Sequence, residues 1–176
     1  MKCPTCGREM KSRVRDYDYV ESGLKNVVLK GITVHECKHC GEVLPEISNV
    51  KQIHKWIAEY LVRKQGPLTG DEFRFLRKAL GKNAREIAER IAVNPVSISR
   101  WECNKVPIGA QSDRLFRMTF ILGLPEEARM FTESKCLEIA RAVLQRRTTT
   151  AARKPRSQRI EITPRRSEAE DRRAHE

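Results

Sequence analysis

Hydrophobic and polar residues follow two different patterns along the chain. As far as about Pro45, β-branched and aromatic residues form short runs separated by Gly23 and Gly31, as in short antiparallel strands joined by a turn or a bulge. From Ser48 onward, apolar residues recur every three or four positions, which is the period of an amphipathic helix. The pattern therefore predicts an α+β protein, with a small strand-rich unit followed by a helical bundle.

These changes of pattern divide the chain into four segments. We expect a strand-rich domain, a connecting helix, a helical domain of about five helices and a tail, at residues 1–47, 48–66, 67–147 and 148–176. The tail is rich in arginine, has almost no aliphatic residues and is interrupted by Pro155 and Pro164. Such a composition is typical of disorder, so we expect a disordered basic tail that is solvated and has no role, the alternative being loose attraction to phosphates.

Capping residues place the helix starts in the helical domain. Two pairs have the spacing of a capping box, Thr69 with Glu72 and Asn83 with Glu86. A third start lies at Asn94 and Pro95, because proline at the first helical position lacks an N–H that would be unpaired there. The helices that start at Asn83 and Asn94 are separated by a short turn, and this spacing suits a helix-turn-helix.

The helix that starts at Pro95 carries the candidate DNA-reading residues. We expect the apolar residues of the motif to face inward, namely Ile87, Ala88, Ile91, Ile98 and Trp101. The candidates for DNA contact are Asn94, Pro95, Val96, Ser97, Ser99 and Arg100. In helix-turn-helix proteins this end of the second helix enters the major groove, where Arg100 could pair with guanine and Val96 could pack against a thymine methyl. An ion pair with a carboxylate or a phosphate contact is the alternative for Arg100.

The charge of the chain agrees with an acidic partner. Lysine and arginine number 35 against 23 aspartate and glutamate residues, which gives a formal net charge of +12. Lys82, Arg85 and Lys105 flank the motif and suit phosphate contacts, which set register and affinity without reading sequence. We therefore expect double-stranded DNA as the partner, the alternative being a basic surface that only keeps the protein soluble.

The chain has no segment that predicts a membrane or an export signal. No apolar run reaches the roughly 18 to 20 residues that cross a bilayer, and the first residues lack the apolar core of a secretion signal. We expect a cytoplasmic protein with no membrane partner.

Two pairs of cysteines have the spacing of a zinc site. Cys3 and Cys6 form one Cys-x-x-Cys pair, Cys37 and Cys40 form the other, and a glycine follows each pair. Each turn can direct two thiolates to one ion, so the two turns together give a tetrahedron with no open position. A closed site of this kind is structural, and we expect one structural zinc ion. A unit of this size cannot be held together by apolar burial alone.

The cysteines and histidines allow alternatives to a four-cysteine zinc site. A redox dithiol would need a βαβ setting, which the pattern does not contain, and would leave the second pair without a role. His35 and His39 could replace a ligand, but four cysteines already satisfy the ion. Cys103 and Cys136 lie beside no histidine and carboxylate in the spacing of an activated nucleophile, so we expect no enzyme.

The chain resembles the MqsA-type antitoxin family, in which a YgiT-type zinc finger precedes an Xre-like helix-turn-helix. The resemblance covers roughly residues 1–124. It is carried by Met1-Lys2-Cys3-Pro4-x-Cys6, by Val28-Leu29-Lys30-Gly31 leading to Cys37-x-x-Cys40, and by Ser99-Arg100-Trp101-Glu102. The chain departs from the family's pattern at Val96, where family members tend to have a polar side chain, and in the long segment after Leu124.

The resemblance implies partners that the residues alone do not give. It implies a homodimer formed through the helical domain, a palindromic operator, and a zinc domain that binds a toxin of the messenger-cleaving type. We therefore expect a sequence-specific transcriptional regulator, the antitoxin of a type II toxin–antitoxin pair that represses its own operon. The alternative is a stand-alone zinc-containing helix-turn-helix repressor with no toxin partner.

Overall fold

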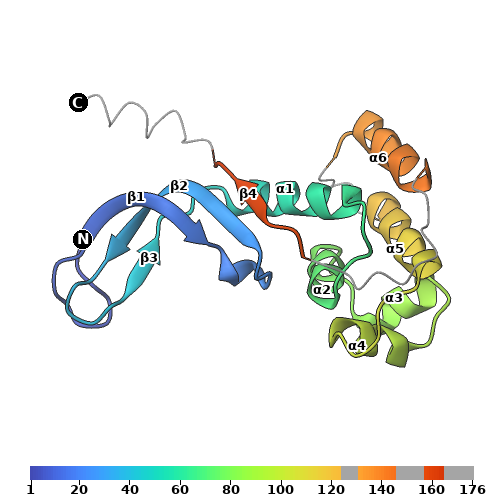
Figure 1. The fold of residues 1–176 in the computed structure, drawn as a ribbon, viewed down its shortest axis with the longest axis horizontal. Helices are drawn as coiled ribbons and strands as arrows, with labels where there is room; N and C mark the ends of the chain where they lie inside the picture. Colours follow the sequence, from blue (N-terminus) through green and yellow to red (C-terminus); the bar gives the residue numbers. More distant parts are fainter. Residues whose placement is uncertain (124–130, 146–156, 165–176) are drawn as a thin grey trace. The chain divides into compact units, whose positions relative to one another are not determined.

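A computed structural model describes residues 1–123, 131–145 and 157–164, which form two compact units (Figure 1). The first unit comprises Met1–His54 and Arg159–Glu176, and the second comprises Lys55–Gln158. In the described residues all four paired strands of the sheet belong to the first unit, and most of the helical residues belong to the second. The α+β class predicted from the sequence is therefore confirmed. No helix among the described residues is both long enough and apolar enough to span a bilayer.

The first unit is built on one sheet with β2 at its centre. The strands are β1 (Lys11–Asp18), β2 (Val27–Glu36), β3 (Val43–Pro45) and β4 (Ile160–Ile162), and a 3₁₀ turn, η1 (Val20–Ser22), lies between β1 and β2. β1 pairs antiparallel with β2 along nearly its whole length. β3 pairs antiparallel with the end of β2, and β4 pairs parallel with its beginning.

A bulge interrupts the β1–β2 ladder at the glycine where the sequence predicts a turn or a bulge. Arg15 pairs with Ile32 and Tyr17 with Leu29, so that Lys30 and Gly31 together lie opposite Asp16. Gly31 has a φ of 62°, a conformation that few residues other than glycine adopt. Its N–H donates to Asp16 Oδ1 over 3.2 Å, so the side chain of the partner strand satisfies a donor at the break.

The expectation of a disordered tail over residues 148–176 is wrong at β4. Ile160 and Ile162 are buried in the sheet of the first unit, while Glu161 between them is exposed. An alternating apolar–polar–apolar triplet is a strand pattern, but here it is only three residues long and lies within an arginine-rich segment whose average composition indicates disorder. The rest of the expected tail, residues 148–156 and 165–176, lies outside the described residues.

The second unit contains the helical bundle. Its elements are α1 (Val50–Arg63), α2 (Gly70–Ala79), α3 (Ala84–Arg90), α4 (Pro95–Glu102), α5 (Ala110–Gly123) and α6 (Glu133–Gln145), and the unit boundary falls within α1. In the described residues α1 is followed by five helices, as expected. Residues 124–130 lie outside the described part of the chain, and α6 starts at Glu133.

Both predicted capping boxes are present at the starts of α2 and α3. The side chain of Thr69 accepts from the N–H of Glu72, whose carboxylate accepts from the N–H of Thr69. The same reciprocal pair joins Asn83 and Glu86. Each box satisfies two donors that the helix itself leaves unpaired, and therefore fixes where these helices begin.

A fully buried arginine joins α5 to the end of α1. Arg117 has an exposed fraction of 0% and pairs with Asp113, one turn earlier on α5, with 2.9 Å between Nε and Oδ2. Its two terminal nitrogens donate to four backbone carbonyls at and just beyond the end of α1, those of Leu61, Val62, Lys64 and Gly66. The last carbonyls of a helix lack the N–H donors of a following turn, and Arg117 supplies donors to this end of α1 from another helix.

Candidate metal centre and nucleic-acid interface

The two Cys-x-x-Cys pairs form tight turns at one end of the β1–β2 ladder. The N–H of Gly7 donates to the carbonyl of Cys3 over 2.9 Å, and that of Gly41 donates to the carbonyl of Cys37 over 3.0 Å. Both glycines have positive φ, 72° and 77°, which allows the backbone to curl around the sulfurs. The glycine after each pair therefore has the role expected from the sequence.

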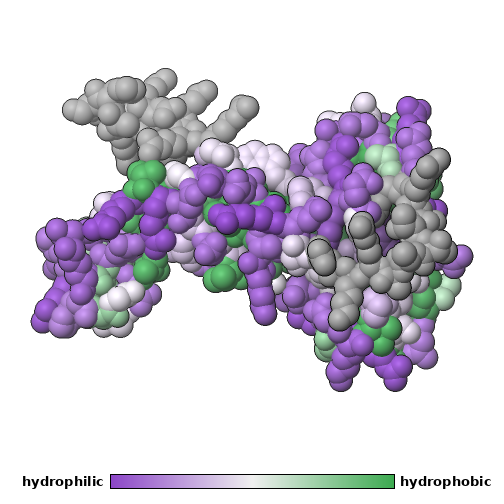
Figure 2. Space-filling view, viewed as in Figure 1, coloured by the Kyte–Doolittle hydropathy of each residue, from purple (hydrophilic) through white to green (hydrophobic). Residues whose placement is uncertain are grey.

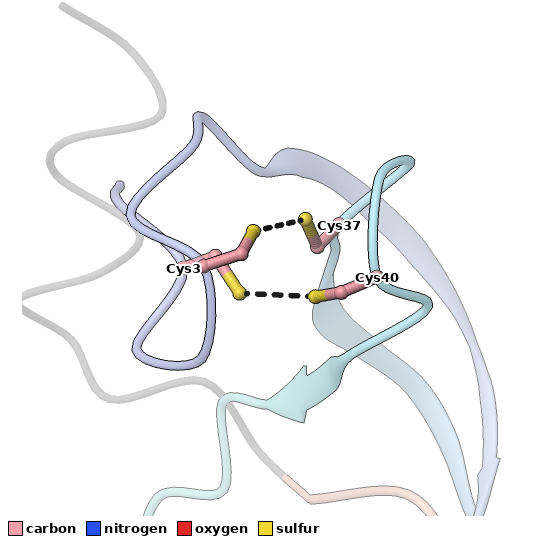
Figure 3. A group of neighbouring side chains, drawn as sticks. Cys3, Cys37 and Cys40 are labelled. Carbon is pink, nitrogen blue, oxygen red and sulfur yellow. Dashed lines mark hydrogen bonds between the residues drawn. The ribbon is translucent and has the colours of Figure 1, made fainter.

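The four sulfur atoms form one close group at the end of the ladder. The ligand atoms of Cys3, Cys6, Cys37 and Cys40 all lie within 4.8 Å of one another. Sγ of Cys3 is 3.5 Å from that of Cys40, and Sγ of Cys6 is 3.5 Å from that of Cys37 (Figure 3). Zn–S bonds of about 2.3 Å give a tetrahedron with edges of about 3.8 Å, whereas a disulfide needs about 2.05 Å. The arrangement fits one structural zinc ion with four thiolate ligands.

The pKa values of two of the thiols are shifted in opposite directions. The backbone N–H groups of Cys40 and His39 lower the pKa of Cys37 to about 6. The backbone N–H of Glu42 acts in the same direction on Cys40, but burial and the neighbouring sulfurs raise the pKa of that thiol to about 12. Four thiolates this close repel one another, and a divalent cation between them removes the repulsion and releases their protons.

The nearby histidines make contacts elsewhere. Nδ1 of His35 is 2.9 Å from Oγ of Ser12, and Nδ1 of His39 is 2.9 Å from Nη1 of Arg8. Among the described residues, the group that could hold a metal consists of the four cysteines alone. The two remaining cysteines lie in the helical unit, Cys103 exposed at the end of α4 and Cys136 half-buried on α6.

The helices α3 and α4 pack through the residues that the sequence predicts. Ile87, Ala88, Ile91 and Ile98 are buried, and Trp101 is half-buried with its ring edge-on to Phe73 of α2 at a centroid distance of 5.8 Å. The connecting turn includes Ala92 with a positive φ of 52°, and the N–H of Val93 donates to the carbonyl of Ala88 over 2.9 Å. Asn94 caps α4, with its side chain accepting from the N–H of Val96 over 2.8 Å.

A carboxylate at the end of α4 fixes this helix to α2. Glu102 is 8% exposed and accepts from Nη2 of Arg77 over 3.0 Å and from Nε of Arg74 over 3.3 Å. Arg74 also donates to the carbonyl of Glu102 over 2.7 Å. The sequence analysis did not find this cluster, although Glu102 follows Trp101 directly and the two arginines are three residues apart on one face of α2.

The start of α2 approaches the same end of α4 closely. The N–H of Gly70 donates to Oδ1 of Asn104 over 2.8 Å. A Cβ atom on Gly70 would lie 2.2 Å from the carbonyl oxygen of Trp101, a distance that no side chain tolerates. Glycine is therefore required at position 70 for reasons of space. Three residues of α2, Gly70, Arg74 and Arg77, contact the C-terminal end of α4 and the residues that follow it.

The candidate DNA-contacting residues of α4 are mostly exposed. Asn94, Pro95, Ser99 and Arg100 are exposed, Val96 is 55% exposed, and Ser97 is half-buried. In the part of the chain that the structure describes, Arg100 makes no ion pair with a carboxylate. The described residues therefore offer no partner for the ion-pair alternative considered above. Figure 2 shows hydrophilic residues over most of the visible surface of the helical unit.

The three flanking basic residues differ in their surroundings. Lys105 is exposed and follows α4. Lys82 is half-buried and pairs with Glu86 over 2.8 Å, while the largely exposed Arg85 pairs with Glu89 over 3.2 Å. Exposed pairs of this kind contribute little to stability and are easily exchanged for other partners, so Lys82 and Arg85 remain available to a stronger anion such as a phosphate.

Comparison with known proteins gives one family. The family model described as the antitoxin component of a bacterial toxin–antitoxin system, MqsA, matches residues 1–119, from the first zinc turn to within α5. No curated protein and no solved structure matches the chain. The matched region includes all four metal ligands and both helices of the α3–α4 pair, and the chain belongs to the MqsA family of antitoxin components.

Proposed function

We propose that this chain is the antitoxin of a type II toxin–antitoxin pair, and that it represses its own operon by binding an operator through α4. One observation carries the proposal: α4 has one face fixed by Ile98 and Glu102, while the opposite face exposes Arg100 without a carboxylate partner among the described residues. A helix held in this way can present the same side chains to every DNA site. Membership of the antitoxin family supports the assignment.

Each DNA-contacting residue has a role that follows from its chemistry. The guanidinium of Arg100 can donate two hydrogen bonds to O6 and N7 of guanine, and Val96 can contact only an apolar group such as the thymine methyl. Ser97 and Ser99 carry hydroxyl groups that suit phosphate contacts or a position near the bases. Asn94 and Pro95 lie beside them at the N-terminal end of α4. Lys82, Arg85 and Lys105 supply further phosphate contacts, which set the register and the salt dependence of binding.

The proposal includes two protein partners and a location. Two copies of the chain would bind the two halves of a palindromic operator, because the symmetry of the DNA site mirrors that of the dimer. The zinc unit would bind the toxin, which leaves α4 free for DNA. Both activities place the protein in the cytoplasm. Co-expression with the product of the adjacent reading frame tests the toxin assignment, and the expected result is a complex that co-purifies with the antitoxin.

Selection of bound sites from random DNA tests the DNA assignment. We expect a palindromic consensus, and Arg100→Ala should weaken binding to it by about 5- to 150-fold, the equivalent of roughly 1–3 kcal/mol, with little effect on unrelated DNA. Lys105→Ala should weaken all DNA to a similar extent. Arg141→Ala, an exposed arginine on α6, is the matched control and should change neither. An unchanged site preference in the Arg100 variant would exclude this residue from base reading.

A further inference from the structure

The two edges of β2 are filled in different ways. β1 pairs along one edge of β2. This ladder begins where Lys11 pairs with Glu36 and ends where Asp18 pairs with Val28. The other edge is shared: β3 pairs with the end of β2, and β4 pairs with the segment 27–29 (Figure 1). β4 comes from residues 160–162, which lie outside the 1–119 region that matches the family. The family region of this chain therefore leaves part of its central strand open, and a segment beyond that region fills it.

The filled edge has the chemistry of a peptide-binding site. Ile160 pairs with Val27 and Ile162 with Leu29, and all four side chains are buried. The N–H of Ile160 donates to the carbonyl of Asn26 over 2.8 Å. Glu161 lies on the opposite face, where its side chain is exposed and pairs with Arg159 over 3.0 Å. The edge therefore recognises an extended backbone together with two aliphatic side chains, two residues apart.

β4 is joined to β2 by a short parallel ladder. It has three paired positions, as β3 has, against seven for β1, and parallel pairing is slightly less stable per residue than antiparallel pairing. The segment 27–29 is also held from its other side, because Leu29 pairs with Tyr17 and the N–H of Tyr19 donates to the carbonyl of Val27 over 2.9 Å. β2 thus keeps a partner strand at this point when β4 leaves.

We propose that the edge of β2 at residues 27–29 is an acceptor site for an extended peptide with aliphatic residues at positions i and i+2, and that β4 occupies it in cis. Exposed sheet edges bind extended peptides through main-chain hydrogen bonds, and pockets for alternate side chains give the selectivity. A partner protein that adds a strand to this edge has to displace β4 first. The site stands independently of DNA binding and of any toxin.

The test uses the full-length, zinc-loaded protein and a labelled peptide. Ile160→Asp with Ile162→Asp releases β4, and Glu161→Gln is the control because the side chain of Glu161 is exposed. The probe is the synthetic peptide Ser-Gln-Arg-Ile-Glu-Ile-Thr-Pro, which copies residues 157–164. Fluorescence anisotropy should show at least about tenfold tighter binding to the released variant than to the wild type or the control, since an attached strand competes in cis. The same peptide with both isoleucines replaced by aspartate should bind neither.

Hydrogen exchange shows where the peptide binds. In the released variant, amide exchange should rise in residues 26–30 and stay unchanged in residues 32–36, and added peptide should restore protection to 26–30. Equal binding of the peptide to wild type and variant would overturn the proposal, as would binding with no protection of 26–30. The released variant could also lose its zinc and the amide protection of the whole β1–β2 ladder. If added peptide did not restore them, the proposal would be overturned, because β4 would then be a fixed part of the fold.

Discussion

Arg117 offers the strongest test of how the helical unit is held together. Replacing it with methionine keeps most of the side-chain volume but removes every donor of the guanidinium. Asp113 then remains buried without the guanidinium of Arg117, although it still accepts the N–H of Leu68 over 2.9 Å. The four carbonyls at the end of α1 lose their donor at the same time.

The magnitude follows from these two losses. A buried charge left without its partner costs about 3–5 kcal/mol. Each buried carbonyl without a donor adds about 1 kcal/mol or more unless water reaches it. We therefore expect Arg117→Met to lower the free energy of unfolding of the helical unit by at least about 4 kcal/mol, a large part of the 5–15 kcal/mol that stabilises a typical domain.

The two tryptophans of the chain make this unit easy to follow. Trp56 and Trp101 both lie in the unit Lys55–Gln158, so tryptophan fluorescence during urea unfolding reports on this unit and not on the zinc unit. The exposed Arg141→Met is the matched control and should change the free energy of unfolding by less than about 0.5 kcal/mol. Adding Asp113→Leu to Arg117→Met removes the stranded charge, so the double variant should be more stable than the single one.

The reasoning fails on either of two results. An Arg117→Met variant that loses less than about 1 kcal/mol would mean that the arginine contributes no more than an ordinary single hydrogen bond. The second result concerns the double variant. If adding Asp113→Leu to Arg117→Met lowers the free energy of unfolding by as much as Asp113→Leu does in the wild type, the two residues do not act together.

Three further predictions concern α4 and the zinc unit. Gly70→Ala should lower the free energy of unfolding by about 1–3 kcal/mol in the fluorescence assay, because its Cβ would meet the carbonyl of Trp101. Gly109→Ala, with open space around its Cβ, should be nearly neutral. Equal effects of the two substitutions would contradict the steric argument. Glu102→Ala removes the carboxylate that pairs with the guanidinium of Arg77, and it should reduce operator affinity and the free energy of unfolding together. A loss of affinity alone would indicate a direct contact of Glu102 with DNA instead. Removal of zinc by a chelator should abolish amide protection in the β1–β2 ladder and leave the tryptophan signal unchanged; protection that survives chelation would show that the sheet does not need the ion.

The sequence predicts best what depends on short spacings. The two Cys-x-x-Cys turns, both capping boxes and the bulge at Gly31 are each determined by a few neighbouring residues, and the structure has all of them. These features need no knowledge of how distant segments pack. Their local chemistry was enough to locate the metal site and the start of each helix in the α2–α4 region.

The features that the sequence analysis missed depend on contacts between distant segments. Asp113 and Arg117 have the spacing of an ordinary surface pair on a helix, and nothing in that spacing reveals that the guanidinium reaches backbone carbonyls more than fifty residues earlier. β4 was missed because two isoleucines carry little weight in an average over an arginine-rich tail. In both cases the partner is backbone, which has no signature in the sequence.

The position of the metal turns has a consequence for how the hairpin aligns. One turn precedes β1 and the other directly follows β2, so the distance between the two sulfur pairs depends on which residues of the strands lie opposite each other. A slip by one residue would move the pairs about 3.4 Å apart along the strands and reverse which side chains face the core. Only one alignment brings four sulfurs to a single ion, and the cation therefore selects the correct pairing from the misaligned ones as the chain folds.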